Sequence, residues 1–146
     1  MNLQEHVSYA VRDGIARAIA VVGLAGVALI HLLDAPGTFQ AAAYKGWLYV
    51  ALIVGSMLAA AALVRRDDTL AWAAVAALSA GAIVAFVISR TIGLPQGADD
   101  IGNWTEPLGM ASLFVEGSLV GLSAMVLRER LALPVGRRVL GSAVRA

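Results

Sequence analysis

The stretch LAWAAVAALSAGAIVAFVIS, residues 70–89, decides the fold of this chain, because it contains no Asp, Glu, Lys or Arg. A helix of about 20 apolar residues spans the roughly 30 Å hydrocarbon core of a bilayer. The stretch shows no alternation of apolar and polar residues, which a strand of a membrane barrel would require. We therefore predict that residues 70–89 cross a membrane as an α-helix.

Three further stretches have the same character, namely residues 15–33, 46–64 and 107–127. Their only charged side chains are Arg17, near the start of the first stretch, and Glu116, within the last. Short connections make consecutive helices neighbours. The sequence therefore predicts an all-α polytopic membrane protein, an antiparallel four-transmembrane-helix bundle in which residues 1–146 form a single membrane domain.

The composition agrees with a membrane protein. Of the 146 residues, 60% are hydrophobic and 14% are charged, against about 45–50% and about 25% in soluble domains. Cysteine is absent, which excludes disulfides and thiolate chemistry. The formal net charge is +1, so no overall field favours a nucleic-acid partner. The lipid bilayer is the first partner that the sequence predicts.

The segments between the predicted helices carry residues typical of turns and helix ends. Residues 34–37 read Asp-Ala-Pro-Gly and are expected to end the first helix. Residues 65–68 are expected to form a tight polar hairpin, and residues 93–97, which contain Gly and Pro, to break the chain after the third helix. Thr105 is expected to cap the fourth helix, with Pro107 in its first turn.

The basic residues predict the orientation, because Lys and Arg near span ends accumulate on the cytoplasmic side. Only Lys45 and Arg90 fall on one side of the predicted spans. The other nine basic residues fall on the opposite side, with both termini: Arg12, Arg17, Arg65, Arg66, Arg128, Arg130, Arg137, Arg138 and Arg145. We expect both termini in the cytoplasm, and residues 34–45 and 90–106 outside.

The cytoplasmic ends suggest further partners and a location. The tail, residues 128–146, carries five Arg among apolar residues and is expected to lie on anionic lipid. Arg outnumbers Lys ten to one and Ala is abundant, a composition typical of GC-rich bacteria. The predicted location is therefore a bacterial cytoplasmic membrane.

Small residues recur at helical spacing in three of the predicted spans. They are Ala16, Ala20 and Gly23 in the first, Ala77, Gly81, Ala85 and Ser89 in the third, and Gly117 and Gly121 in the fourth. Such spacing lets helix backbones approach closely in lipid. We expect these residues to pack the bundle, and such faces also suit a homo-oligomer or a larger membrane complex.

Glu116 is the most informative polar residue. It follows Glu106 by ten residues, which places it about 15 Å along a helix and near the middle of the membrane. An ionised carboxylate at that depth costs a few kcal/mol, so it should face the bundle interior, carry a proton or meet a donor. A buried structural acid and a proton-, ion- or ligand-binding acid are both consistent with the sequence.

His31 lies near the outer end of the first predicted span. Asp34 follows it by three residues, so the carboxylate is placed to orient the imidazole. The pair is suited to relaying a proton or binding a metal, but two such side chains do not make a metal site. The simpler interpretation is an interfacial His with a hydrogen-bonded neighbour.

Arg90 ends the third predicted span and is one of two basic residues on the outer side. Its aliphatic stem can be buried while its guanidinium reaches an acid. The candidates are Asp34, Asp99, Asp100, Glu106 and Glu116. An ion pair that pins the outer loop, which also holds Trp104, is the simpler interpretation, and a site for a carboxylate-bearing ligand is the alternative.

Short motifs give the chain a resemblance to known proteins. The motifs are Ser-Arg-Thr-Ile-Gly-Leu-Pro at residues 89–95, then Trp104, Glu-Pro-Leu-Gly at residues 106–109, Glu116, and His31. In these the chain resembles small four-helix integral membrane proteins of actinobacteria. The resemblance implies the same topology and singles out His31, Arg90, Glu106 and Glu116, but implies no activity. In size, and in having one intramembrane Glu, the chain is also similar to small multidrug transporters, whose Glu lies on the first helix.

Three functions remain open from the sequence. We expect His31, Arg90, Glu106 and Glu116 to line a polar pocket in the outer half of the bundle. The first function is a non-enzymatic accessory subunit, or a component that binds a ligand or partner there. The second is a small proton- or cation-coupled transporter or channel that uses Glu116. The third is a membrane enzyme or metal-binding protein that uses His31 and nearby acids, and no cofactor is indicated.

Overall fold

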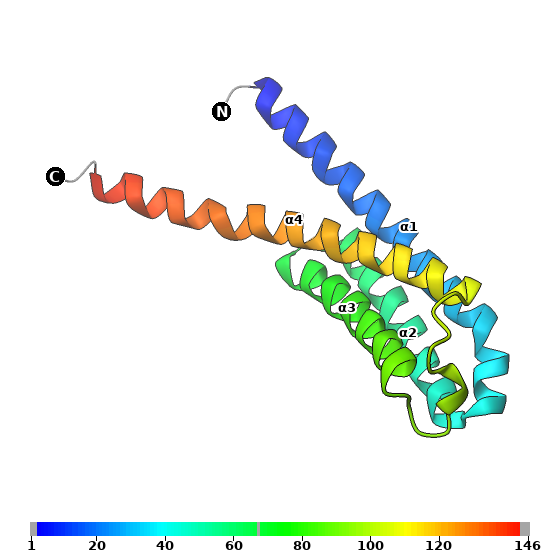
Figure 1. Ribbon diagram of the computed structural model, residues 1–146. Helices are drawn as coiled ribbons and strands as arrows, with labels where there is room; N and C mark the ends of the chain where they lie inside the picture. The colour runs from blue at the N-terminus through cyan, green and yellow to red at the C-terminus, as the bar shows by residue number, and fades with distance from the viewer. Residues whose placement is uncertain (1–2, 67, 144–146) are drawn as a thin grey trace.

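The computed structural model describes the backbone of residues 3–66 and 68–143 and the side chains of residues 4, 7–66 and 68–132. The described chain is helical, as predicted (Figure 1). Its elements are α1 (Leu3–Ala41), α2 (Ala43–Arg65), α3 (Thr69–Thr91), the 3-10 turn η1 (Ala98–Asp100) and α4 (Pro107–Ala143). The side chains of Arg137 and Arg138, and all of Arg145, lie outside the described residues.

Four of these helices are long and apolar enough to cross a membrane. The qualifying segments are Val7–Ala41, Ala43–Arg65, Thr69–Thr91 and Pro107–Ala132, and each contains one predicted span. The shortest have 23 residues, or about 35 Å of helix, which exceeds the roughly 30 Å hydrocarbon core. The prediction of an all-helical protein with four potential spans is therefore confirmed.

The first helix extends beyond its predicted end. The sequence favours a turn at residues 34–37, but α1 continues through Pro36 to Ala41, so that prediction is wrong. Proline removes one backbone hydrogen bond and bends a helix without having to end it, and Figure 1 shows the last turns of α1 running in a different direction from the rest.

The chain then reverses at a single extended residue, Ala42. The corner is tight, because a Cβ atom at Gly46 would overlap the ring of Phe39. Packing at this corner, rather than the turn-forming residues 34–37, sets where α1 ends.

The four helices pack as a ring in which α1 and α3 each contact both α2 and α4. Consecutive helices are therefore neighbours, as predicted. The ends of α1 and α4 that lead to the chain termini, together with the α2–α3 turn, lie at one end of the bundle, which we call the terminal end (Figure 1). The α1–α2 corner and η1 lie at the opposite end, which we call the loop end.

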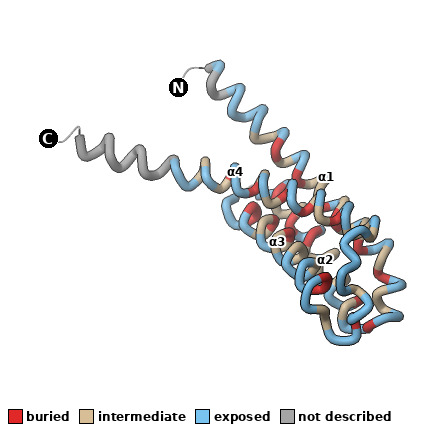
Figure 2. Tube along the Cα trace, in the orientation of Figure 1, coloured by how far each residue is buried: buried red, intermediate tan, exposed pale blue. Residues whose placement is uncertain are grey.

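The buried side chains face inward, and the outer surface of the bundle is exposed (Figure 2). That outer surface is apolar: Val22, Leu70 and Phe114 are 72%, 74% and 77% exposed, respectively. Exposed apolar surface on this scale is unfavourable in water and expected against lipid. The arrangement suits a bundle whose solvent is the membrane.

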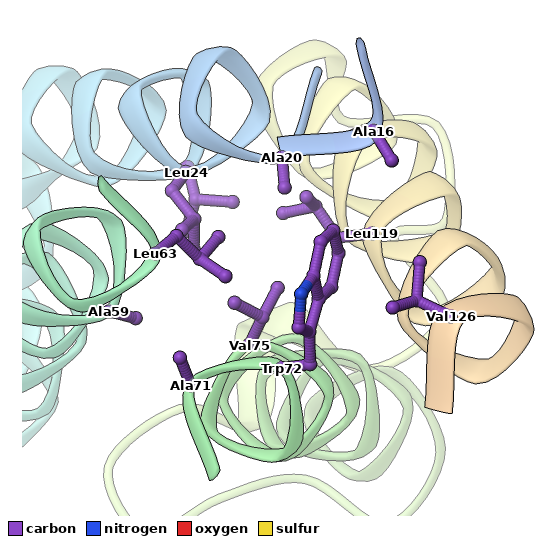
Figure 3. Close-up of a cluster of buried hydrophobic side chains, with 11 residues drawn as sticks. Ala16, Ala20, Leu24, Ala59, Leu63, Ala71, Trp72, Val75, Leu119 and Val126 are labelled. Atoms are coloured by element: carbon purple, nitrogen blue, oxygen red, sulfur yellow. The ribbon is translucent and has the colours of Figure 1, made fainter. Parts of the chain in front are cut away.

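An apolar cluster fills the half of the bundle toward the terminal end (Figure 3). Trp72, Leu63 and Leu24 are its largest members, all at most 1% exposed, and Trp72 points from α3 toward Leu119 of α4. Leu63 and Trp72 belong to the last turn of α2 and the first turn of α3, respectively. The cluster therefore makes this level of the bundle, which we call the apolar layer, largely apolar, with the Ser123 hydroxyl buried between Leu119 and Val126.

The predicted helix contacts of small residues are confirmed in α1, but some of those predicted in α3 and α4 are wrong. Ala16 and Ala20 are buried, and a Cβ atom at Gly23 would lie 2.8 Å from Leu119 Cδ2. By contrast, a Cβ atom at Gly81, Gly117 or Gly121 would meet nothing within 4 Å. These three glycines face outward because the facing sides of α3 and α4 use larger residues instead.

Candidate functional site

Glu116 lies deep inside the bundle on α4, where it is only 1% exposed. One turn earlier on the same helix, Ser112 is also buried, and its Oγ donates a hydrogen bond of 2.8 Å to Glu116 Oε1. The carboxyl group thus faces the interior, as its cost in lipid requires. Ser112 provides one of the donors that a buried acid needs.

His31 of α1 faces Glu116 across the α1–α4 contact. Its Nε2 atom lies 3.9 Å from Glu116 Oε1, and its Nδ1 atom lies 2.9 Å from the carbonyl oxygen of Val27. A carbonyl oxygen can only accept, so Nδ1 carries a hydrogen and donates it. Nε2 is therefore the nitrogen that can gain or lose a proton beside the carboxyl group.

This geometry suits a pair that shares one proton. With a neutral imidazole, Nε2 presents a lone pair to a protonated Glu116; with an imidazolium, Nε2–H faces a carboxylate. At 3.9 Å the contact is longer than a hydrogen bond, so a small movement of either helix would make or break one. The proton is the smallest ligand that this arrangement can hold.

Tyr49 of α2 completes the surroundings of His31. The two rings meet edge to face, with centroids 4.7 Å apart and planes at 83°. The Tyr49 hydroxyl donates a 3.0 Å hydrogen bond to Asp34 Oδ2, which Thr38 also approaches at 3.4 Å. Asp34 therefore accepts a hydrogen bond from Tyr49 rather than from His31, whose Nδ1 donates to the Val27 carbonyl oxygen instead.

A second polar group surrounds Arg90 at the end of α3. Its side chain is only 9% exposed, and Nη1 lies 2.9 Å from Asp100 Oδ1 while Nη2 lies 3.9 Å from Glu106 Oε2. The guanidinium carbon lies 4.8 Å from the centre of the Phe86 ring, a cation–π distance. Of the five acids that the sequence offers, Asp100 is thus the closest partner, with Glu106 farther away.

Asp100 links this group to α2. Lys45 Nζ lies 3.0 Å from Asp100 Oδ2, and the Ser89 hydroxyl approaches the same oxygen at 3.4 Å. Burial alone would raise the pKa of Asp100, but the hydrogen bonds and charges of Lys45 and Arg90 outweigh it and hold that pKa below its usual value. Asp100 is therefore ionised and joins two helices and η1.

Glu106 caps α4. Its two carboxylate oxygens accept hydrogen bonds from the backbone N–H groups of Leu108 at 3.0 Å and Gly109 at 2.6 Å. The sequence favours Thr105 for this role, and that prediction is wrong by one position. A carboxylate at a helix N-terminus also interacts favourably with the helix dipole, so Glu106 is placed by the local structure of α4.

The predicted site residues form two groups of hydrogen bonds and ion pairs. His31, Glu116 and Asp34 gather with Tyr49 and Ser112, whereas Arg90 and Glu106 gather with Asp100 and Lys45. Trp104, which is 42% exposed, belongs beside the second group, with its ring centroid 6.1 Å from that of Phe86. About 15 Å of α4 separates Glu116 from Glu106.

Neither a grouping of metal ligands nor a comparison with known proteins assigns a function to these residues. Among the described side chains, those of residues 4, 7–66 and 68–132, no three His, Asp or Glu are grouped so as to hold a metal ion. No protein-family model, curated protein or solved structure matches the chain. The resemblance to actinobacterial membrane proteins thus stays an interpretation of the sequence.

Proposed function

We propose that the protein is a multi-pass component of a bacterial cytoplasmic membrane, an antiparallel bundle with both termini in the cytoplasm. Nine basic residues lie on the side of the two termini and the α2–α3 turn, and only two lie on the opposite side. This asymmetry supports the orientation, because Lys and Arg accumulate on the cytoplasmic side. The placement of those segments at the terminal end in Figure 1 agrees with one cytoplasmic side. The loop end then faces outward.

Within this frame, the protein acts as a non-enzymatic binding component that holds a proton between His31 and Glu116. The observation that carries the proposal is the 3.9 Å approach of His31 Nε2 to a carboxyl group that is 1% exposed. Holding one proton costs less than burying two separate charges at low dielectric. Since the pair joins α1 to α4, gain or loss of the proton changes how the two helices pack.

The apolar layer favours binding over conduction. Val27 lies one turn from His31, and Leu119 lies one turn from Glu116, both toward the terminal end and both at most 2% exposed. Beyond them come Leu24, Leu63 and Trp72. The hydroxyl group of Ser123 is buried at the same level but does not titrate near neutral pH, so a proton leaving toward the cytoplasm meets no titratable acceptor in this cluster. The pair therefore exchanges its proton with the outer side, where a ligand or accessory partner would sense the state of the helices.

Infrared spectroscopy of the protein in lipid vesicles tests this proposal. A buried carboxylic acid gives a carbonyl band that a carboxylate lacks. We expect such a band in the wild type, its loss in Glu116→Gln, and a shift of its pH dependence in His31→Gln. Glu106→Gln is the matched control and should keep the band. A wild-type spectrum unchanged by both Glu116→Gln and His31→Gln would show that neither side chain of the pair holds the proton and would overturn the proposal.

A proton- or cation-coupled transporter is the second candidate, favoured by the depth of Glu116, about 15 Å from the start of α4. It requires the apolar layer to open during a transport cycle. Vesicles loaded with a pH-sensitive dye test it. Proton uptake that Glu116→Gln abolishes would establish transport, whereas vesicles as tight as protein-free controls would exclude it.

A further inference from the structure

A groove on the surface of the bundle separates α2 from α3 near the terminal end. Its volume is about 620 Å³, within the roughly 300–1,000 Å³ range of small-molecule sites. Small side chains line it, with Gly55, Ala59 and Ala62 from α2 and Ala71, Ala74 and Ala77 from α3. The groove exists because these residues leave the space between the two helices unfilled.

Measured along the helices, the groove is about as long as one leaflet of a bilayer is thick. Gly55 and Leu78 close it toward the loop end, since a Cβ atom at Gly55 would lie only 3.0 Å from Leu78 Cδ2. Arg66 lines its other end. Gly55 and Arg66 are eleven positions apart, which corresponds to about 16 Å of helix, roughly half of a 30 Å hydrocarbon core. A partner helix would need a seam through both leaflets, whereas one lipid acyl chain needs only this length.

The mouth of the groove carries charged side chains of both signs, Arg66 and Asp68. Arg66 is exposed there beside Arg65 at the end of α2. The nearby acid, Asp68, uses its carboxylate to cap α3, accepting a 2.8 Å hydrogen bond from the Ala71 N–H group. The guanidinium groups thus lie at the level of lipid phosphates, with which Arg forms charge-assisted hydrogen bonds.

We propose that the α2–α3 groove binds an anionic phospholipid of the cytoplasmic leaflet, with one acyl chain between the small residues and the phosphate on Arg66 and Arg65. This inference is independent of the His31–Glu116 pair. It concerns a different surface from the C-terminal tail, and it adds a specific lipid to the partners of the bundle.

Trp72 provides a reporter, because it is 0% exposed and therefore shielded from bulk lipid, while its backbone adjoins the groove residue Ala71 on α3. In a variant with Trp47→Phe and Trp104→Phe, it is the single Trp. Chain-brominated lipids quench Trp fluorescence only at short range. We expect brominated phosphatidylglycerol to quench Trp72 at lower mole fraction than brominated phosphatidylcholine, on the order of fivefold for each Arg that engages the phosphate.

Two comparisons locate the lipid. Replacing Arg65 and Arg66 by Gln should abolish the preference for phosphatidylglycerol, while Arg12→Gln, on α1, should keep it. Ala77→Leu should fill the groove and reduce quenching by both lipids, while Ala73→Leu, one turn away and outside the groove lining, should not. Native mass spectrometry of the wild type from mixed vesicles gives the same comparison if the single-Trp variant does not fold.

Equal quenching by the two lipids, together with no retained phosphatidylglycerol in the mass spectrum, would overturn the proposal. If Ala77→Leu instead dissociated a dimer and left the lipid preference unchanged, the groove would hold a second copy of the chain, and the lipid assignment would be wrong. Symmetric vesicles make both results independent of the orientation of the protein.

Discussion

Arg90 Nη1 lies 2.9 Å from Asp100 Oδ1, so the last turn of α3 holds the η1 turn that follows it. The same carboxylate lies 3.0 Å from Lys45 Nζ of α2. A backbone hydrogen bond of 2.9 Å from the Gly102 N–H group to the Arg90 carbonyl oxygen adds to this attachment. The loop between α3 and α4 is therefore fixed to two helices at the loop end.

Asp100→Asn should loosen this loop. The substitution removes the charge that faces both Arg90 and Lys45, and we expect a loss of about 1–2 kcal/mol. This value lies between those of exposed and buried ion pairs, because Asp100 is a third exposed while Arg90 is buried. Thermal unfolding in detergent and protease cleavage within residues 94–104 measure it. Asp99→Asn, at the exposed neighbouring position, is the control and should change neither.

Acidification should release the same loop. Arg90 and Lys45 hold the pKa of Asp100 below its usual value, so their stabilising effect is complete above the unfolded-state value of about 3.9. It is lost as the pH falls through the lower pKa of the folded protein. Exchange of the Gly102 amide hydrogen, corrected for its intrinsic pH dependence, should accelerate only in that acidic range. Wild-type and Asp100→Asn proteins with the same pH profile would contradict this assignment.

The sequence was sufficient to predict the four helices but not all of their ends. Lipid leaves long uncharged runs few alternatives to a helix, so residues 46–64 and 70–89 were readily assigned. The end of α1 was missed because it depends on a tertiary contact. Phe39 packs on Gly46 and meets the Trp47 ring at a centroid distance of 5.7 Å, and both partners lie in the next helix.

The candidate site was predictable for charged residues and less so for neutral ones. Glu116 and Arg90 attract attention because charge is costly beside apolar runs. Ser112 is one helical turn from Glu116, so i,i+4 spacing was a usable signal. Tyr49 carries no such signal, because a neutral aromatic residue near the end of a span is common in membrane proteins. Its place beside His31 depends on the rotation of α2 against α1, which a single sequence does not specify.

The His31–Glu116 pair should tolerate an amide better than a hydrocarbon. Glu116→Gln keeps an oxygen that accepts from the Ser112 hydroxyl and a polar group beside His31, so we expect little loss of stability. Glu116→Leu leaves the Ser112 hydroxyl without this acceptor, at about 1–3 kcal/mol, and places an apolar side chain beside His31 Nε2. The double substitution His31→Phe with Glu116→Leu should be more stable than Glu116→Leu alone, as measured by thermal unfolding in detergent. A double variant no better than the single one would show that the two side chains do not interact.

Two glycines that look alike in the sequence should respond oppositely to alanine. At Gly46 a Cβ atom would overlap the Phe39 ring, and the corner between α1 and α2 would have to shift, at a cost of about 1–3 kcal/mol. At Gly81 a Cβ atom would meet nothing within 4 Å, so only helix propensity changes, which favours alanine by up to about 1 kcal/mol. Thermal unfolding in one detergent compares the two variants. Phe39→Ala should partly rescue Gly46→Ala, because it removes the ring that the added methyl group meets. If Gly46→Ala were as stable as the wild type, the close approach of α2 to the end of α1 would be disproved, and with it the reason that α1 continues past Pro36.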